Sequence, residues 1–277
     1  MQATAAANSV FAANRAAGRI ALEVQCDAGR TRRRHVYEDG PLRVRFPNTD
    51  GAALEAVTVN TAGGMTGGDR HHLDLHVGAE AKLTITTAAA EKIYRSLGPD
   101  AEIDIKLRVD PGGTLSWLPQ ETIVFDRARL KRGIEADLAD GASLLMAEAI
   151  VFGRSAMGET VEQGALTDRW RVRRGGQLMF AETVRLDGAV ARKLAEPAVA
   201  AAGAAIASVL LVPADAAEIG AKVEAVRAQS FCGEVGISAW NGLAVARLCA
   251  KDGASLRRDL AAVLSALGAA VPRLWSQ

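Results

Sequence analysis

The sequence predicts a mainly β protein, a β-helix-like stack of short strands followed by a smaller C-terminal α/β portion. Apolar and polar residues alternate over many short runs between residues 18 and 193, which is the pattern of half-buried strands. A similar segment recurs there at a spacing of roughly 30 residues, as stacked supersecondary units do. After residue 193 the pattern changes. We therefore expect a flexible N-terminal segment at 1–17, a repetitive β core at 18–193, and an α/β portion at 194–277 packed on the core.

The strand prediction rests on period-two alternation between turn residues. Glycine, aspartate and proline separate the alternating runs, for example at Asp110-Pro111 and at Asp187-Gly188. Because successive side chains of a strand point to opposite faces, each run presents one apolar face to a core. The apolar positions are Ile20, Leu22 and Val24; Leu42, Val44 and Phe46; Leu73, Leu75 and Val77; Leu83 and Ile85; and Ile103, Ile105, Leu107 and Val109.

The internal repeat is clearest in two heptapeptides. Glu121-Thr-Ile-Val-Phe-Asp-Arg127 resembles Glu148-Ala-Ile-Val-Phe-Gly-Arg154, and Glu91-Lys-Ile-Tyr-Arg95 is a weaker copy. Each copy follows a glycine turn and a strand, so the repeat favours a β-solenoid or a repetitive sheet stack. A meandering β protein also repeats strand, turn and strand, and the sequence leaves that alternative open.

The C-terminal portion contains both helices and strands. Residues 198–212 read as a buried strand, and Asp215 is placed to cap a helix that runs to about residue 229. Asn241-Gly242 is a strong signal for a two-residue hairpin. Residues 255–267 form an amphipathic pattern that stops at Gly268, which is typical of a helix and its C-terminal glycine.

Composition excludes several classes of function. Lys and Arg (33) balance Asp and Glu (32), so the net charge of +1 provides no electrostatic footprint for nucleic acid or an acidic membrane. We expect no spanning helix, because no uninterrupted apolar run reaches about 18 residues. Three cysteines without paired spacing, and no recognisable export signal, favour a cytoplasmic protein.

A glycine-rich loop and a histidine-rich strand are the most unusual segments. Residues 60–69 hold four glycines, but a strand rather than a helix follows, which favours a tight turn over a phosphate-binding loop. His72, Asp74 and His76 share one face of that strand, and imidazole and carboxylate in this arrangement suit Ni²⁺ or Zn²⁺. The alternative is a solvated strand face with chance histidines.

Several acidic residues lie in apolar surroundings. A buried carboxylate is usually paired with a cation, and Arg127 or Arg154 is a candidate partner for Glu148. The alternative is a carboxylate that lines a polar passage. The acidic residues concerned are Glu91, Glu121, Asp126, Glu148, Glu159 and Glu182. No zinc-protease, Cys-x-x-Cys, nucleophile-elbow or dinucleotide motif occurs, so we expect no enzyme activity.

Four motifs resemble, in their order, those of the D-type (also called H-type) urease accessory proteins. They cover about residues 41–190, and the Trp-Leu-Pro-Gln-Glu-Thr string is highly specific. The motifs are Asn60-Thr-Ala-Gly-Gly-Met-Thr-Gly-Gly-Asp69, Thr86-Thr-Ala-Ala-Ala-Glu-Lys-Ile-Tyr-Arg-Ser96, Leu115-Ser-Trp-Leu-Pro-Gln-Glu-Thr-Ile-Val-Phe-Asp126 and Glu148-Ala-Ile-Val-Phe-Gly-Arg-Ser-Ala-Met-Gly-Glu159.

The resemblance implies a β-helix-like fold and a non-enzymatic role as a urease maturation factor. It implies a complex with the F-type accessory protein and the G-type GTPase, which docks on apo-urease and delivers Ni²⁺ through an internal polar route. Asp69 and Glu182 are then the first candidates for carboxylates on that route, with Glu148 and Glu159 behind them. Ni²⁺ would bind transiently, and no tightly bound cofactor is expected.

Two other functions compete with nickel delivery. A purely structural adaptor would need no metal, because carboxylates in a stack of strands can simply be ion-paired. A metal-dependent hydrolase would use the segment from His71 to His76, in which His72, Asp74 and His76 lie outside the family motif. The absence of a paired nucleophile and base weakens the hydrolase hypothesis.

Overall fold

The computed structural model describes residues 15–48, 51–154 and 157–276. The predicted fold class is confirmed: the protein is mainly β, with a β-solenoid-like stack of about four turns and a few C-terminal helices. Residues 1–14 of the predicted N-terminal segment lie outside the described residues, and the first strand begins at Ala17.

The first sheet has seven strands in the part of the chain described. Its neighbours along the sheet are β14 (Gln177–Ala189), β13 (Gln163–Arg174), β11 (Arg129–Leu138), β8 (Ala101–Val109), β5 (Arg70–Val77), β1 (Ala17–Asp27) and β2 (Arg30–Asp39). The five inner strands from β13 to β1 are parallel, and each end of the sheet adds an antiparallel strand.

The second sheet faces the first. Its main path is β16 (Glu234–Trp240), β17 (Leu243–Ala250), β15 (Ala205–Val212), β12 (Ser143–Phe152), β9 (Thr114–Trp117), β6 (Lys82–Thr87), β4 (Leu54–Asn60) and β3 (Leu42–Arg45). Two short strands, β7 (Glu91–Ile93) and β10 (Thr122–Val124), form a parallel strip that continues onto the end of β12.

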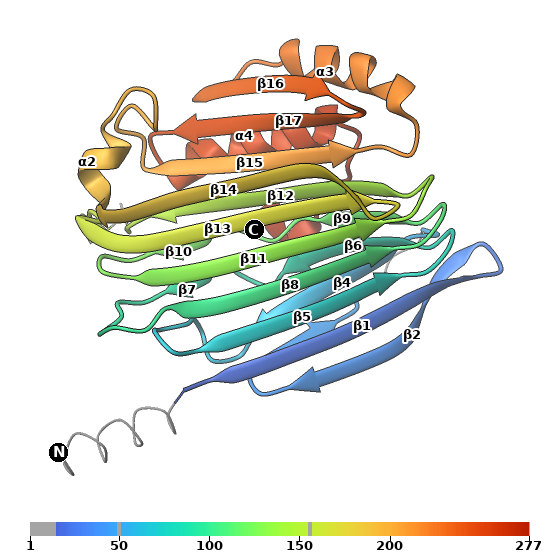
Figure 1. Ribbon diagram of the computed structural model, residues 1–277, viewed down its shortest axis with the longest axis horizontal. Helices are drawn as coiled ribbons and strands as arrows, with labels where there is room; N and C mark the ends of the chain where they lie inside the picture. Colours follow the sequence, from blue (N-terminus) through green and yellow to red (C-terminus); the bar gives the residue numbers. More distant parts are fainter. Residues whose placement is uncertain (1–14, 49–50, 155–156, 277) are drawn as a thin grey trace.

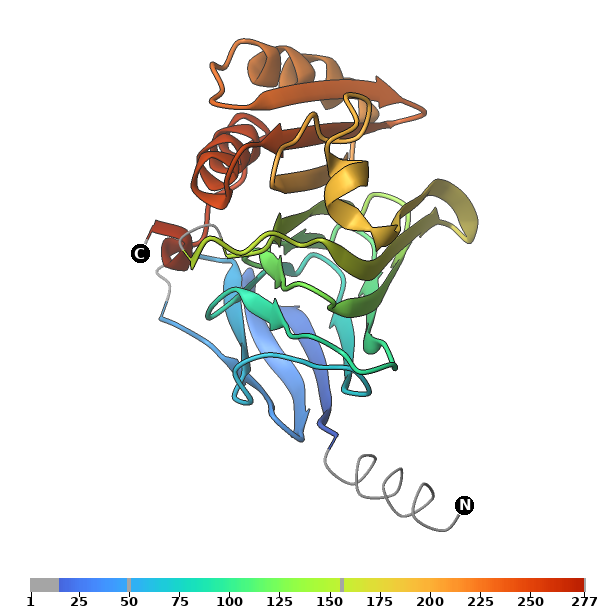
Figure 2. The same ribbon diagram turned by 90° about the vertical axis from the view of Figure 1, so that its left-hand side faces the viewer.

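The chain alternates between the two sheets, and this alternation produces the stack. It passes from β4 to β5, β6, β8, β9, β11, β12 and β13, and each return adds a parallel strand to the same sheet. Figure 1 shows the stack running from β2 at one end to β16 and α3 at the other, and Figure 2 shows it from the side. Inward apolar residues such as Leu75 and Leu107 pair across strands and form one continuous core between the sheets.

The C-terminal portion extends the second sheet, because β15 pairs with β12. Helices α3 (Ile219–Arg227) and α4 (Gly253–Ala266) bury apolar faces in a second core, together with residues of β12, β15 and β17 (Figure 1). The remaining helical turns are α2 (Val190–Leu194), η2 (Ala216–Glu218) and η3 (Arg273–Ser276). No helix in the described part of the chain is both long and apolar enough to cross a membrane.

Most local predictions for this portion are confirmed. Asp215 accepts a hydrogen bond from Ala217 N at the start of η2, and Trp240 pairs with Leu243 across the predicted hairpin turn. The strand predicted at 198–212 is too long, since β15 starts at Ala205. The preceding alanine-rich residues instead form turns, in which Ala202 N donates to Leu194 O. Alanine has little preference for strands, so tertiary contacts decide this boundary.

The internal repeat corresponds to stacked strands, but with a shift of one residue. The sequence repeat aligns Glu121 with Glu148, whereas the structure pairs Thr122 with Ile150 and with Glu91. A shift of one residue reverses the face to which a side chain points. Glu148 therefore lies inside the stack, while Glu121 points outward and forms a salt bridge with Arg257 of α4 at 2.6 Å.

Candidate functional site

Three charged side chains meet in the interior between the two sheets. Arg132 of β11 donates through Nε and Nη2 to Asp168 of β13, at 3.0 and 2.6 Å. Its Nη1 donates to Glu148 Oε2 of β12 at 2.5 Å. All three side chains are at most 4 % exposed. The guanidinium thus joins the first sheet to the second across the core.

The strand pattern places these groups inside. Leu130, Arg132 and Ile134 lie on the inward face of β11, so Arg132 replaces an apolar residue of the alternation. Two indole groups complete the hydrogen bonding, because Trp117 Nε1 donates to Glu148 Oε1 at 2.7 Å and Trp170 Nε1 donates to Asp168 Oδ1 at 3.2 Å. The described contacts therefore satisfy both carboxylates.

One cation shared by two carboxylates leaves an excess of negative charge. Burial raises the pKa of Glu148 to about 7, and Asp168 adds to this effect, although Arg132 and Trp117 oppose it. Burial alone would lower the pKa of Arg132, but the two carboxylates raise it above its ordinary value, so the guanidinium remains charged. Glu148 is consequently a carboxyl group that can change its charge near neutral pH.

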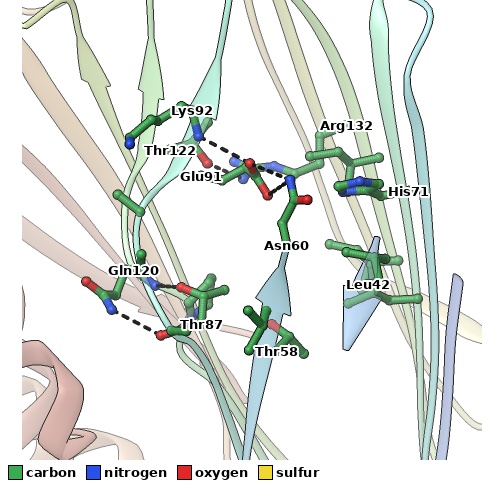
Figure 3. Close-up of a pocket in the computed structure, with 18 of the residues that line it drawn as sticks. Leu42, Thr58, Asn60, His71, Thr87, Glu91, Lys92, Gln120, Thr122 and Arg132 are labelled. Atoms are coloured by element: carbon green, nitrogen blue, oxygen red, sulfur yellow. Dashed lines mark hydrogen bonds between the residues drawn. The ribbon is translucent and has the colours of Figure 1, made fainter. Parts of the chain in front are cut away.

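A cavity of about 170 Å³ adjoins this cluster (Figure 3). Arg132 and Glu148 of the cluster line it, together with Asn60, His71 and Glu91. Burial lowers the pKa of His71 to about 4, with Asp69 opposing, so the imidazole is neutral at pH 7. Burial also raises the pKa of Glu91 to about 7, against the opposing hydrogen bonds that the Asn60 amide donates to its oxygens at 3.1 and 3.2 Å.

Two further cavities continue from the same cluster. A cavity of about 20 Å³ is lined by Glu148, Asp168 and Glu182, and so shares Glu148 with the first. A wider one of about 600 Å³ shares Glu182 and Ser208 with the second, and it includes Arg247. The Arg247 guanidinium donates to Glu182 Oε1, whereas Glu182 Oε2 is buried and has no hydrogen-bond partner among the described residues.

The charges that line the three cavities favour a cation. Among the described residues, five carboxylates line them, against the three cations Arg132, Lys92 and Arg247, of which only Arg132 is buried. Lys92 and Arg247 are both exposed. Carboxylate and imidazole are suitable ligands for first-row divalent ions. The five carboxylates are Glu91, Glu148, Asp168, Glu182 and Glu234.

The sequence-predicted route residues fall into two groups. Glu148 and Glu182 line the cavities described above. Asp69 is buried, but its two oxygens accept backbone hydrogen bonds from Ala16 N and Thr66 N, both at 2.8 Å, and it lines none of the three cavities. Asp69 therefore holds the glycine-rich loop against the start of β1.

Glu159 and the histidine-rich strand face line none of the three cavities, although Glu159 lines a separate cavity of about 400 Å³. Glu159 accepts from Arg154 Nε at 2.7 Å, and this bond lowers its pKa. His72, Asp74 and His76 alternate with the buried residues of β5 and point to the outer face of the first sheet, as the pattern predicted. His76 Nε2 lies 2.9 Å from Asp110 Oδ2. The described residues contain no group of three or more His, Cys, Asp or Glu side chains placed to hold a metal ion.

The predicted cationic partner of Glu148 is wrong. Arg127 lies 3.6 Å from Asp126, and Arg154 pairs with Glu159, because the one-residue shift places Glu148 on the inner face. Sequence reasoning included His71 only in the segment considered for a hydrolase, and did not identify it as a residue of the interior. Its signal is its position on the apolar face of β5, opposite the three polar residues that attracted attention.

The glycine-rich loop forms a wall of the first cavity. Met65 N donates to Lys92 O at 2.7 Å, and Tyr94 Oη donates to Gly63 O at 3.1 Å. A Cβ on Gly64 would lie 2.4 Å from the Tyr94 ring and 2.8 Å from Lys92 O, so glycine is required for this close approach. The expected tight turn, followed by a strand, is confirmed.

Comparison with known proteins gives consistent matches over almost the whole chain. The family model for the UreD urease accessory protein matches residues 16–276. The chain is 57% identical to a urease accessory protein UreD of Rhodopseudomonas palustris (strain BisA53), covering 98% of this chain and 94% of that protein. It is 56% identical to the protein of that name from Bradyrhizobium diazoefficiens, covering 97% of this chain and 96% of the relative.

Proposed function

Because the chain belongs to the UreD family of urease accessory proteins, we propose that it carries Ni²⁺ through its polar interior toward apo-urease. In this proposal it acts in a complex with the F-type accessory protein and the G-type GTPase. Family membership implies a part in urease maturation, and the relatives are named accessory proteins.

The observation that carries the proposal is the series of adjoining cavities lined by carboxylates. The first cavity reaches exposed residues at Gly63 and Lys92, the second shares Glu148 with it, and the third reaches exposed residues at Arg247. Carboxylate oxygens bind Ni²⁺ less tightly than thiolate or clustered imidazole, so such a route favours transfer over storage.

The Arg132 cluster is the narrowest part of this route. Glu148 borders both the first cavity and the second, whose volume is only about 20 Å³. A divalent ion that passes here meets the positive guanidinium at close range, and its passage requires the carboxylates to exchange Arg132 for the metal. Partner binding that shifts β11 relative to β12 would open this point.

Nucleotide chemistry is assigned to the G-type partner. The glycine-rich loop of this chain leads into the strand β5 rather than a helix, and its amides are engaged by Lys92 O, Asp69 and Asp100 O. A phosphate group needs free amides at a helix N-terminus or a nest.

The rival function is a structural adaptor without a metal role. The pairing of Asp69 with backbone amides and of Glu159 with Arg154 favours it for these two residues. It does not account for Glu182, whose Oε2 is buried beside two cavities without a described partner.

The test is urease activation in a reconstituted mixture of apo-urease, the F and G partners, GTP, bicarbonate and Ni²⁺. Activation is measured without this chain, with it, and with Glu182→Gln, Glu148→Gln or the matched control Glu159→Gln. We expect activation to need the chain, to fall at least about tenfold with the first two variants, and to be retained with the control.

The other outcomes separate the hypotheses. Normal activation with Glu182→Gln and Glu148→Gln, while every variant still assembles with the partners, would leave only the adaptor. Activation that does not need the chain would contradict a maturation role for this protein.

A further inference from the structure

Strand β2 (Arg30–Asp39) is an edge strand whose far side is open. It pairs with β1 alone, and it is the outermost strand of the first sheet at one end of the stack (Figure 1). Among the described residues, Thr31 N donates to Ala52 O, and no other backbone hydrogen bond joins the far side of β2 to a neighbour. Such an edge presents amide and carbonyl groups with which another extended chain can pair.

Arginine is concentrated along this edge. Residues 27–45 contain six arginines and one histidine against three acidic residues, although the whole chain is almost neutral. Arg30, Arg32 and Arg33 are exposed and form no salt bridge with a described residue. The other three arginines are ion-paired: Arg34 with Glu23, and Arg43 and Arg45 with Glu38. The β2 edge therefore has positive charge that its described surroundings do not compensate.

The two faces of β2 differ in chemistry. Arg32 pairs in register with an outward-facing residue of β1, so it lies on the outer face of the sheet. Val36 pairs with the buried Leu22 and lies on the inner face, where it is 38 % exposed. Arg33 shares that inner face, and its guanidinium is 4.8 Å from the centre of the Phe46 ring. A strand added beside β2 thus meets charge on one face and exposed apolar surface on the other.

We propose that the β2 edge docks an extended acidic segment of a partner protein, in which acidic residues alternate with apolar ones. The segment adds to the first sheet as a further strand and pairs its backbone with the open side of β2. Its acidic side chains meet the arginines of the outer face, and its apolar side chains lie beside Val36. Alternation with a period of two fixes the register, because a slip of one residue would exchange the two faces.

The charge of the edge selects among possible occupants. A second copy of this chain would bring its own arginines against these, so repulsion opposes pairing of two β2 edges. A nucleic acid would contact the arginines but leave the open amide and carbonyl groups unpaired. An acidic peptide strand uses both, since guanidinium groups bind carboxylates through paired hydrogen bonds.

The β2 edge is separate from the cavity series. No residue of β2 lines any of the three cavities in the described part of the chain. Figure 1 also places β2 at the opposite end of the stack from β16, which borders the third cavity. Docking at β2 therefore does not depend on nickel transfer and goes beyond the proposed function.

The test measures binding of a fluorescent synthetic peptide, Glu-Val-Glu-Val-Glu-Val-Glu, to the purified full chain by anisotropy. The wild type is compared with Arg30→Glu/Arg32→Glu and with Lys106→Glu/Arg108→Glu. The second variant is the matched control, because it makes the same change of charge on β8, which has neighbouring strands on both sides. We expect the first variant to weaken binding at least about tenfold and the control to weaken it less than about threefold.

Two further probes separate strand addition from general attraction of a polyanion. The same peptide methylated on every backbone amide keeps its charge but cannot donate hydrogen bonds, so we expect it to bind at least about tenfold more weakly. An oligo(dT) of equal charge is expected to bind as weakly as the methylated peptide. Hydrogen exchange of the β2 amides should slow when the unmodified peptide binds, while exchange in β8 stays unchanged.

Several results would overturn the proposal. One is absence of peptide binding up to about 1 mM. Another is equal binding of the methylated peptide or of the oligonucleotide, which would show attraction of charge without strand pairing. A third is an affinity that Arg30→Glu/Arg32→Glu leaves unchanged, which would place the peptide elsewhere on the protein.

Discussion

Arg132 shows how one side chain determines the charge of the interior. Its guanidinium satisfies two carboxylates from different sheets, and each of the three groups is costly to bury without the others. Paired groups of this kind contribute little net stability, but removal of a single member leaves an uncompensated charge. His71 presents the opposite case, since it is buried without a partner for Nε2 among the described residues.

Replacement of Arg132 by methionine is expected to lower the free energy of unfolding by about 3–5 kcal/mol, because Glu148 and Asp168 then lose their cation. The matched control is Arg129→Met on the same strand, whose salt bridge with Asp100 is half-exposed and contributes at most about 1 kcal/mol. Urea unfolding of both variants measures the difference. An equal loss of unfolding free energy in the two variants would show that burial of the Arg132 cluster does not cause the destabilisation.

Acidification is expected to destabilise the protein through His71. The pKa of His71 is about 4 in the folded chain and 6.5 in the unfolded chain. Between pH 4 and pH 6.5 the folded state therefore binds fewer protons than the unfolded state. The contribution of His71 to stability is complete above pH 6.5 and is lost as the pH falls to about 4, by about 3 kcal/mol in total.

The measurement compares the pH dependence of urea unfolding, with a metal chelator present, in the wild type, His71→Leu and His72→Leu. The first variant should show a smaller loss of stability between pH 6.5 and 4, and the second should follow the wild type. Identical profiles for all three proteins would contradict a buried neutral His71.

At the scale of elements, the shift between the sequence repeat and the strand register separates two similar glutamates. Glu121 and Glu148 occupy the same place in their heptapeptides, yet Glu121 binds Arg257 of α4 and Glu148 binds Arg132 in the interior. One copy of the repeat therefore provides Glu121, which binds helix α4, and the other provides Glu148, which lines the cavities. Strand register, which the hydrophobic pattern sets, makes this distinction.

The stacking of the glycine-rich loop on β7 predicts different tolerances for adjacent glycines. Gly64→Ala would place a methyl group against the Tyr94 ring and Lys92 O, in a backbone conformation with φ +150°, so we expect a loss of at least about 2 kcal/mol. Gly63→Ala meets no atom within 4 Å at φ +76° and should cost about 1 kcal/mol. Thermal unfolding of the two variants tests this order, and a reversed order would refute the close packing.

At the scale of the whole molecule, the cavities depend on parts of the chain that are far apart in sequence. The first lies under the loops after β4 and β6, and the third is bordered by β14, β15 and β17. The C-terminal strands therefore extend the second sheet and also border the wide end of the cavity series. A substitution that narrows either the first or the third cavity should therefore reduce urease activation, even though the other cavity keeps its structure.

Gly236→Trp is expected to reduce urease activation without loss of stability. Gly236 lines the third cavity, whose volume is about 600 Å³, and a Cβ there meets no atom within 4 Å, so the first atom of a new side chain is accommodated beside the cavity. Gly220→Trp on α3 is the control, because it also has free space and lines none of the three cavities. Activation assays and partner pull-downs are compared. Normal activation with Gly236→Trp would show that this cavity is not on the route.

Local patterns predicted most of the elements because they depend on near neighbours in the sequence. The alternation of β5 and β8, the hairpin at Asn241-Gly242 and the capped segment after Asp215 all follow from side-chain periodicity and turn chemistry. The glycine-rich loop was likewise predicted as a tight turn, because the alternating residues that directly follow it indicate a strand rather than a helix.

The sequence by itself determined a mainly β stack, its apolar faces and its family, since these depend on periodicity and on ordered motifs. Only the tertiary structure decided which carboxylates face the interior. Glu148 and Glu182 line cavities, Asp69 holds a loop, and Arg132 rather than Arg127 or Arg154 pairs with Glu148. The physical reason is that a shift of one residue in register reverses a face, and register depends on contacts between strands distant in sequence.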